Sequence, residues 1–149
     1  GPIVLAGGIA DGTALWAARA LGCDLAYMGT KFIATEESLA DAAYKAMLVD
    51  STIDDIVLTS AFTGLPTSML LPSIVAAGLD PATLDEQVSV PQAAEMYGGK
   101  GTSDGPKRWR DIWSAGHSVG GVDRIRPVAD LVEQTRLEYE AARAAASAL

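Results

Sequence analysis

The sequence has a single cysteine, a deficit of basic residues and no long hydrophobic run. Cys23 on its own excludes a framework of internal disulfides and fits a reducing compartment. No uninterrupted apolar stretch reaches the length that crosses a bilayer, and the first residues lack the basic region of a signal peptide. We therefore expect a cytoplasmic protein that does not span a membrane.

Basic residues number 11 and acidic residues 19, which gives a formal net charge of −8 at pH 7. Affinity for nucleic acid comes mostly from Lys and Arg on phosphates, so we expect neither nucleic acid nor an anionic membrane surface as a partner. The adjacent acids Asp54 and Asp55 have no histidine or third acid at ligand spacing. The sequence therefore predicts no metal site.

Residues 2–30 have the pattern of a strand, a helix and a second strand. The apolar run 3–6 stops at Gly7-Gly8, and apolar residues then recur at helical spacing over 13–21, before a glycine that suits a helix C-terminus. A second apolar run, 25–28, stops at Gly29-Thr30. Two buried parallel strands joined by a helix make a βαβ unit, in which ligands bind beyond the carboxyl ends of the strands.

Glycine follows both of these strands. Ordinary turns of an α/β protein are one explanation, but the pair on successive strands favours an anion that approaches the backbone there. Without a Cβ, a turn can bring its N–H groups against a phosphate. We predict one phosphate between Gly7-Gly8 and Gly29-Thr30, with the Thr30 hydroxyl as a further donor. Asp11 is expected to cap the helix and turn away from the anion. For Lys31, a solvated position at a helix or loop edge is favoured, and a local positive charge for the anion is the alternative.

The segment 1–38 resembles the seventh and eighth strands of the nitronate monooxygenase family of FMN-dependent barrel enzymes, formerly called 2-nitropropane dioxygenases. The related enoyl-reductase flavoproteins share the pattern. In the family, an AGGI-x-DG turn and an xGT turn hold the phosphate of FMN. The resemblance therefore implies FMN as the cofactor, with these cofactor-binding residues: Gly7, Gly8, Tyr27, Met28, Gly29 and Thr30.

A second stretch, WRDIWSAGHSVGGV at 109–122, resembles the C-terminal AGQ-x-VG segment of the family. His117 stands where the family usually has glutamine, which makes it a candidate catalytic residue near the flavin, able to donate, accept or exchange a proton. A purely structural role in the turn is the alternative. The family's upstream catalytic histidine has no match here, and Ser68 stands near the position of a family arginine, which puts a substrate-anion contact there in doubt.

The fold class that the resemblance implies is α/β, as the C-terminal portion of a (β/α)8 TIM barrel with a mainly helical C-terminal extension. Such a barrel takes about 250 residues, whereas this sequence has 149. We therefore expect the remainder of the barrel to be missing from this chain. The predicted organisation is 1–50 as the last two βα units, 51–126 as an irregular and helical substrate-side segment, and 127–149 as a C-terminal helix.

Beyond the βαβ unit, the patterns predict further helices, one strand and two loops. One helix is expected at about 37–49, with Thr35 as its cap, and a second at 70–78, with Pro72 in its first turn. A short helix or turn is expected at 91–97, and a further helix around Trp109, Ile112 and Trp113 packed inward. The last helix is expected at 127–147, with a tail from Ala141 that is frayed or solvent-facing; the strand is expected at 54–60 and the loops at 62–69 and 98–106.

Two other motifs fail their sequence tests. Residues 116–120 match G-x-S-x-G, but the nucleophile elbow of a hydrolase needs a preceding apolar strand and a later histidine. His117 is the only histidine. The loop 98–106 has Gly101 after Lys100, where a phosphate-binding P-loop requires Ser or Thr.

The sequence thus predicts an FMN-dependent oxidoreductase resembling nitronate monooxygenase. Its substrate is expected to be a small molecule: a nitronate, a quinone or an enoyl thioester. Two alternatives stay open. One is a phosphate-binding barrel of non-flavin chemistry, such as a nucleotide dehydrogenase or a synthase, and the other is an acidic binding module without a cofactor.

Overall fold

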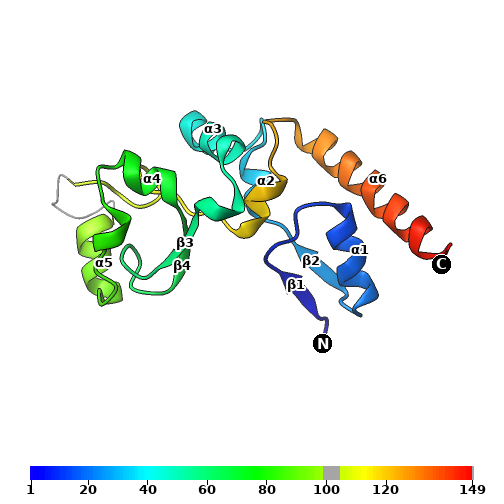
Figure 1. Ribbon diagram of the computed structural model, residues 1–149, viewed down its shortest axis with the longest axis horizontal. Coiled ribbons are helices and arrows are strands. Elements are labelled where there is room, and N and C mark those ends of the chain that lie inside the picture. The colour runs from blue at the N-terminus through cyan, green and yellow to red at the C-terminus, as the bar shows by residue number, and fades with distance from the viewer. Residues whose placement is uncertain (99–104, 149) are drawn as a thin grey trace. The chain divides into compact units, whose positions relative to one another are not determined.

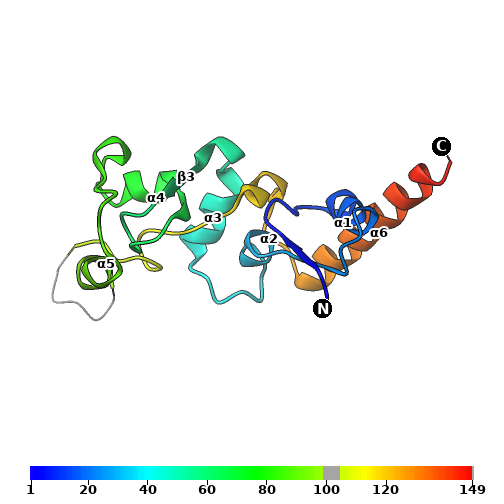
Figure 2. The ribbon, with the colours of Figure 1, turned by 90° about the horizontal axis from the view of Figure 1, so that it is seen from below.

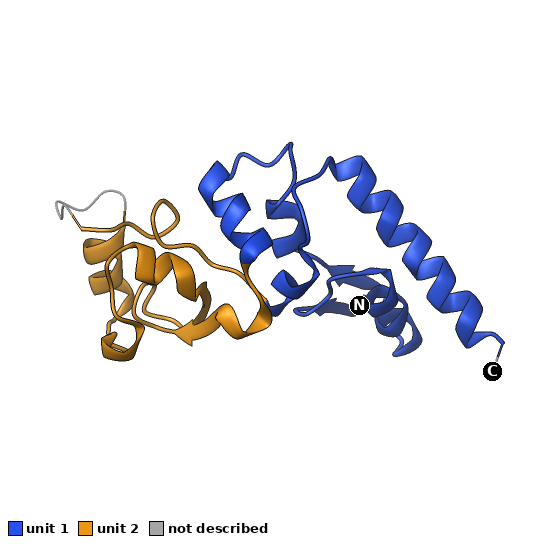
Figure 3. Ribbon diagram, turned by 45° about the horizontal axis from the view of Figure 1, so that its top comes forward, with its two compact units in different colours: residues 1–50, 117–149 blue, residues 51–116 orange. Residues whose placement is uncertain are grey.

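The computed structural model describes residues 1–98 and 105–148, so the middle of the loop expected at 98–106 lies outside the described residues. The chain has a mixed α/β structure and divides into two compact units (Figure 3). Unit 1 comprises 1–50 and 117–149, and unit 2 comprises 51–116. The described strands form two separate two-stranded sheets, and these residues close no barrel.

Unit 1 begins with the predicted βαβ unit, made by β1 (Val4–Ala6), α1 (Gly12–Ala20) and β2 (Leu25–Tyr27) (Figure 1). β1 and β2 pair in parallel, with Ala6 opposite Tyr27. The parallel pairing confirms the prediction that both strands end at the same edge of the sheet.

The ends of α1 are capped as the sequence predicts. The Asp11 carboxylate accepts a hydrogen bond from the Ala14 N–H at 2.7 Å, which satisfies a donor that the first helical turn leaves open. Gly22 has φ +91°, a left-handed conformation that glycine adopts without strain just beyond a helix end.

The rest of unit 1 differs in part from the prediction. Its elements are α2 (Thr30–Ile33), α3 (Ala42–Asp50), the 3-10 turn η3 (His117–Gly121) and α6 (Val128–Ala146). The helix expected from about residue 37 begins only at Ala42. Thr35 is not its cap, because its hydroxyl donates to the Phe32 carbonyl at 2.8 Å, and Asp41 accepts from the Ala43 N–H instead. α6 stays helical to Ala146, so the tail does not fray, but residues 141–148 are mostly exposed, as the sequence predicts.

Helices α1 and α6 lie side by side and form the main contact of unit 1 (Figures 1 and 2). Gly12 allows the close approach, because a Cβ there would lie 2.2 Å from the Thr135 carbonyl oxygen. The Gly12 N–H donates to the Glu138 carboxylate at 2.9 Å. One turn further along, the Trp16 and Tyr139 rings meet edge to face at 5.7 Å.

Unit 2 contains η1 (Ile53–Asp55), β3 (Ile56–Thr59), β4 (Thr67–Leu70), α4 (Leu71–Ala76), η2 (Pro81–Thr83) and α5 (Val90–Tyr97). The strand β3 and the helices α4 and α5 confirm the predicted elements. The loop expected at 62–69 is wrong in its second half, because Thr67–Leu70 pairs antiparallel with β3. Its Gly and Pro content marks only the connection between the two strands.

The core of unit 2 is formed by residues of the β3–β4 connection, β4, α4 and the turn near residue 112. These residues are Ala61, Phe62, Met69, Ile74 and Ile112. The Phe62 ring packs edge to face on Tyr97 of α5 at 5.0 Å. The buried Ser73 hydroxyl accepts from the Trp113 N–H at 2.9 Å, which ties residues 107–116 to α4.

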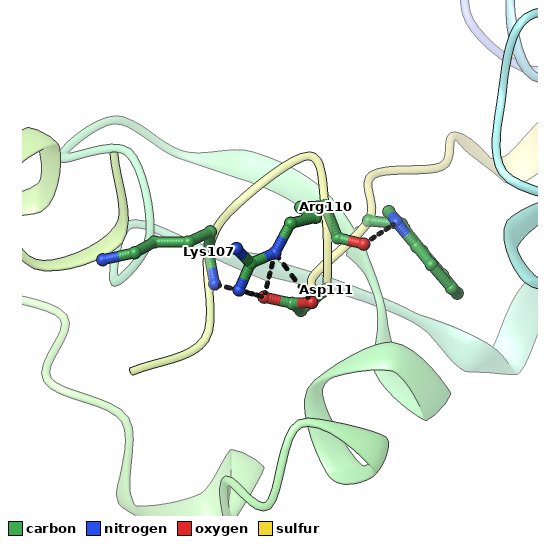
Figure 4. Close-up of polar contacts among 4 residues, drawn as sticks. Lys107, Arg110 and Asp111 are labelled. Carbon is green, nitrogen blue, oxygen red and sulfur yellow. Dashed lines mark hydrogen bonds and ion pairs between the residues drawn. The ribbon is translucent and has the colours of Figure 1, made fainter. Parts of the chain in front are cut away.

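Residues 107–113 form a tight turn, so the helix predicted there is wrong (Figure 4). The Asp111 carboxylate accepts from the Lys107 N–H at 2.8 Å and pairs with Arg110 at 2.7 Å. Trp109 has φ +70° and is 56% exposed, whereas Ile112 and Trp113 are buried. The i, i+3, i+4 spacing of apolar residues therefore does not distinguish a helix from a turn that a carboxylate closes.

None of the helices in the described part of the chain combines the length and the hydrophobicity that a membrane crossing requires.

Candidate functional site

The two glycine turns leave the β1–β2 sheet at the same edge. Because Ala6 lies opposite Tyr27, Gly8 and Gly29 each stand two residues beyond a paired position. Gly7 and Gly8 have φ of +86° and +70°, which residues with a Cβ rarely adopt. The first turn therefore requires glycine for its conformation alone.

Open space borders both turns. A Cβ added to Gly7, Gly8 or Gly29 would meet no atom within 4 Å. In the part of the chain that the structure describes, the Gly8 N–H donates no hydrogen bond. Gly29 has φ −113°, so no backbone strain explains the glycine there. An exposed donor beside open space gives an anion room to approach the backbone.

Thr30 and Lys31 follow directly on the second turn and open α2, and both are buried. The Lys31 ammonium donates to the Ala10 carbonyl, next to the first turn. The prediction of a solvated Lys31 is therefore wrong. Nothing in the local sequence signals this contact, because its partner is a backbone carbonyl of a distant residue.

Tyr27 and Met28 line an apolar groove of about 530 Å3. The other lining residues come from α1, β2, α2 and α6: Leu15, Ala26, Phe32, Val132, Thr135, Arg136 and Tyr139. Tyr27 and Met28, which lead into the second turn, thus line the same groove as residues of α6.

His117 is the exposed first residue of η3, and η3 packs against α2. At the other end of η3, a Cβ on Gly121 would lie 2.6 Å from the Ala10 Cβ. The structure therefore brings three predicted segments together: the first glycine turn, the start of α2 and the segment that carries His117. Gly121 is a site residue that sequence reasoning missed, although it lies within the quoted family motif.

The G-x-S-x-G match does not form a nucleophile elbow. The elbow places its serine, exposed, on a turn between a strand and a helix. Here Ser118 lies buried inside η3, and no strand leads into it.

Arg126, in the segment between η3 and α6, contacts the segment that follows α2. The Glu36 N–H donates to the Arg126 carbonyl at 3.1 Å. The buried Arg126 guanidinium bonds to Asp123 and Gln134. Burial opposes the charge of Asp123, but the hydrogen bond and the charge of Arg126 outweigh it and lower the pKa of this carboxyl group.

No group of three or more His, Cys, Asp or Glu side chains in the described ranges is arranged to hold a metal ion. The chemistry of this region is that of backbone donors in glycine turns, and the exposed His117 begins η3, which packs against α2.

Comparisons with known proteins show which family this chain resembles. The profile of the family described as nitronate monooxygenase matches residues 2–138. A nitronate monooxygenase of Paraburkholderia phytofirmans is 31% identical over 142 residues, which cover 93% of this chain and 38% of the relative.

Two solved structures are also similar. FabK from Thermotoga maritima shares 26% identity with a TM-score of 0.66, covering 99% of this chain and 47% of that one. Nitroalkane oxidase from Streptomyces ansochromogenes shares 32% identity with a TM-score of 0.66, covering 97% and 41%. The chain thus spans less than half the length of each of these proteins.

Proposed function

The chain belongs to the nitronate monooxygenase family, and on this basis we propose that it is part of an FMN-dependent oxidoreductase. In this proposal the chain forms the last two βα units of a TIM barrel and an extension. The phosphate of the flavin is held by the turns Gly7-Gly8 and Met28–Thr30. The observation that carries the proposal is the pair of glycine turns at one sheet edge with open space beside them.

These residues fit the terminal phosphate of FMN. The Gly8 N–H has no partner among the described residues, and backbone N–H groups in turns bind phosphate without a cation. The glycines leave the volume that side chains would fill. Asp11 is held by its bond to the Ala14 N–H, so its carboxylate is engaged in capping α1.

When bound, the flavin supplies the electron-transfer chemistry of the reaction. In this proposal the protein binds and orients it: the turns fix the phosphate end, and η3, which packs against α2, carries His117. At neutral pH an imidazole can donate or accept a hydrogen bond. We propose that His117 takes the place of the usual family glutamine in contacting the flavin or the substrate.

The proposed substrate is a nitronate, in keeping with the family. A quinone or an enoyl thioester is the alternative, because the related enoyl-reductase flavoproteins share the sequence pattern of the two turns. Oxygen consumption with an alkyl nitronate, measured beside NADH and NADPH oxidation with a quinone or an enoyl thioester, separates these activities.

The first test is the visible absorption spectrum of the whole protein, combined with a Gly29→Leu variant. A yellow protein that releases FMN on denaturation is the expected result. Because Gly29 has an ordinary φ and open space around it, leucine is tolerated by the fold but fills the phosphate site. We expect at least a tenfold weaker FMN Kd, which corresponds to about 1.4 kcal/mol.

The matched control is Gly105→Leu, at another glycine where a Cβ meets nothing within 4 Å. This variant should keep the wild-type affinity. A Gly29→Leu protein with unchanged FMN affinity, or a wild type that takes up no FMN, would contradict the proposal and favour a different phosphate ligand.

A further inference from the structure

The contact between Lys31 and Ala10 joins the two turns, and we propose that Lys31 is a positioning residue for the phosphate site. Its ammonium holds α2 against the first turn, so that both turns face one anion. This inference rests on the proposed function, because it concerns the same phosphate. Lys31 itself does not touch the phosphate in this proposal.

Burial makes the contact costly to lose. Lys31 is 6% exposed, and a buried ammonium needs hydrogen bonds to replace those it made to water. Among the described residues Lys31 forms no ion pair within 4.0 Å. The bond to the Ala10 carbonyl is therefore the contact that holds the ammonium in place.

The proposed role of the Lys31–Ala10 hydrogen bond follows from where the two residues lie in the sequence. Lys31 follows Gly29-Thr30 directly, and Ala10 lies two residues after Gly8. A single hydrogen bond thus connects the segments that extend both turns. The close approach of Gly121 to Ala10 supports the same point from the side of η3.

The surroundings of Lys31 argue against a direct contact with phosphate. Lys31 lines a hollow of about 260 Å3 together with Asp11, Asp123 and Glu138. The carboxylates of Asp11 and Glu138 repel an anion from this hollow, whereas the charge of Asp123 is paired with Arg126. The open space beside Gly8 and Gly29 is the place for the phosphate, so Lys31 acts on it through the backbone.

The test compares the affinities for FMN and for riboflavin, which lacks the phosphate, in the whole protein. Lys31→Met removes the ammonium and keeps much of the length of the side chain. We expect Lys31→Met to reduce the preference for FMN over riboflavin at least tenfold. The separate variant Lys31→Arg, which keeps a positive charge, should retain most of the wild-type preference. Lys45→Met is the matched control, since Lys45 is also buried but its ammonium donates to the Glu36 carbonyl.

The possible results distinguish a failure of the proposed phosphate site from a failure of the proposed role of Lys31. A wild type with no preference for FMN over riboflavin contradicts the phosphate site itself. A wild-type preference that survives in Lys31→Met, or that falls equally in Lys45→Met, overturns the role of Lys31. If Lys31→Met does not fold, the shorter and neutral Lys31→Gln takes its place and the same ratio decides.

Salt dependence tests the positioning role against direct contact. If Lys31 only positions the turns, the FMN Kd of wild type and of Lys31→Met changes with ionic strength by the same factor. A flatter dependence in the variant would show an ion pair with the phosphate, and would overturn the positioning role.

Discussion

Gly12 sets the distance between α1 and α6. Its missing Cβ leaves room for the Thr135 carbonyl and the Tyr139 N–H, each of which a Cβ would approach to 2.2 Å. Alanine is the better helix former, so intrinsic propensity opposes this choice. The close packing of the two helices explains the glycine.

Gly12→Ala should therefore destabilise the protein although it lies in a helix. We expect a loss of about 1–3 kcal/mol in the free energy of unfolding, typical of overpacking, measured by urea denaturation. Gly105→Ala, where the added Cβ is free of neighbours, should stay close to wild type. Equal stability of the two variants would show that α6 moves aside at little cost.

The two residues that cap α1 were predictable from the sequence. Asp11 before a helical pattern and Gly22 after it have the expected capping roles. Lys31 and Gly121 were not predictable, because both contact Ala10 from distant parts of the chain. The assignment of the phosphate to Gly7-Gly8 and Gly29-Thr30 remains a prediction.

At the scale of elements, the turn 107–113 depends on one carboxylate. Asp111 accepts from the Lys107 N–H and from the Arg110 guanidinium (Figure 4). The hydrogen bond from Arg110 is the largest cause that lowers the pKa of Asp111, and the bond from Lys107 adds to it. The turn is therefore stabilised by the ionised form of Asp111.

This dependence predicts how stability varies with pH. A pKa lower in the folded than in the unfolded state adds stability above the unfolded value, about 3.9 for Asp. That stability is lost as the pH falls through the folded value. Asp111→Asn should therefore be less stable than wild type at pH 7 and at pH 5, and the difference should shrink as the pH falls below about 4.

Urea denaturation at each pH measures this difference, with Asp54→Asn as the control, since Asp54 accepts no hydrogen bond from a side chain in the described structure. A difference between wild type and Asp111→Asn that stays constant down to pH 3 would contradict the role of the ionised carboxylate.

α4 was predicted correctly because two features of the sequence, apolar residues and residues typical of helix ends, agree. α4 has an apolar run with Pro72 in its first turn and Gly78 beyond its end, and the structure confirms it. β4 was missed because the Gly and Pro residues before it extended the predicted loop. The prediction of a helix at 107–113 was wrong because it rested only on the i, i+3, i+4 spacing of apolar residues.

At the scale of the whole molecule, the β1–β2 sheet leaves apolar side chains uncovered. Ile3, Val4, Leu25 and Tyr27 are each at least 50% exposed. Parallel sheets are ordinarily covered on both faces. In the proposed barrel, neighbouring strands and helices would cover these residues.

The 149-residue chain should therefore bind a hydrophobic dye such as ANS at this sheet. Leu25→Lys is expected to lower the dye fluorescence clearly. Leu39→Lys should have little effect, because Leu39 is fully exposed and lies outside the strands. Equal effects of the two substitutions would show that the dye does not report on the sheet.

The contact between α1 and α6 also bears on synthesis at the ribosome. Gly12 and Glu138, which share a hydrogen bond, stand 126 residues apart in the chain. At roughly 5–20 residues per second, the ribosome delivers the second partner some 6–25 s after the first. During that interval α1 has no α6 to pack against, so a nascent chain paused in unit 2 is the form in which chaperones would find this helix unpaired.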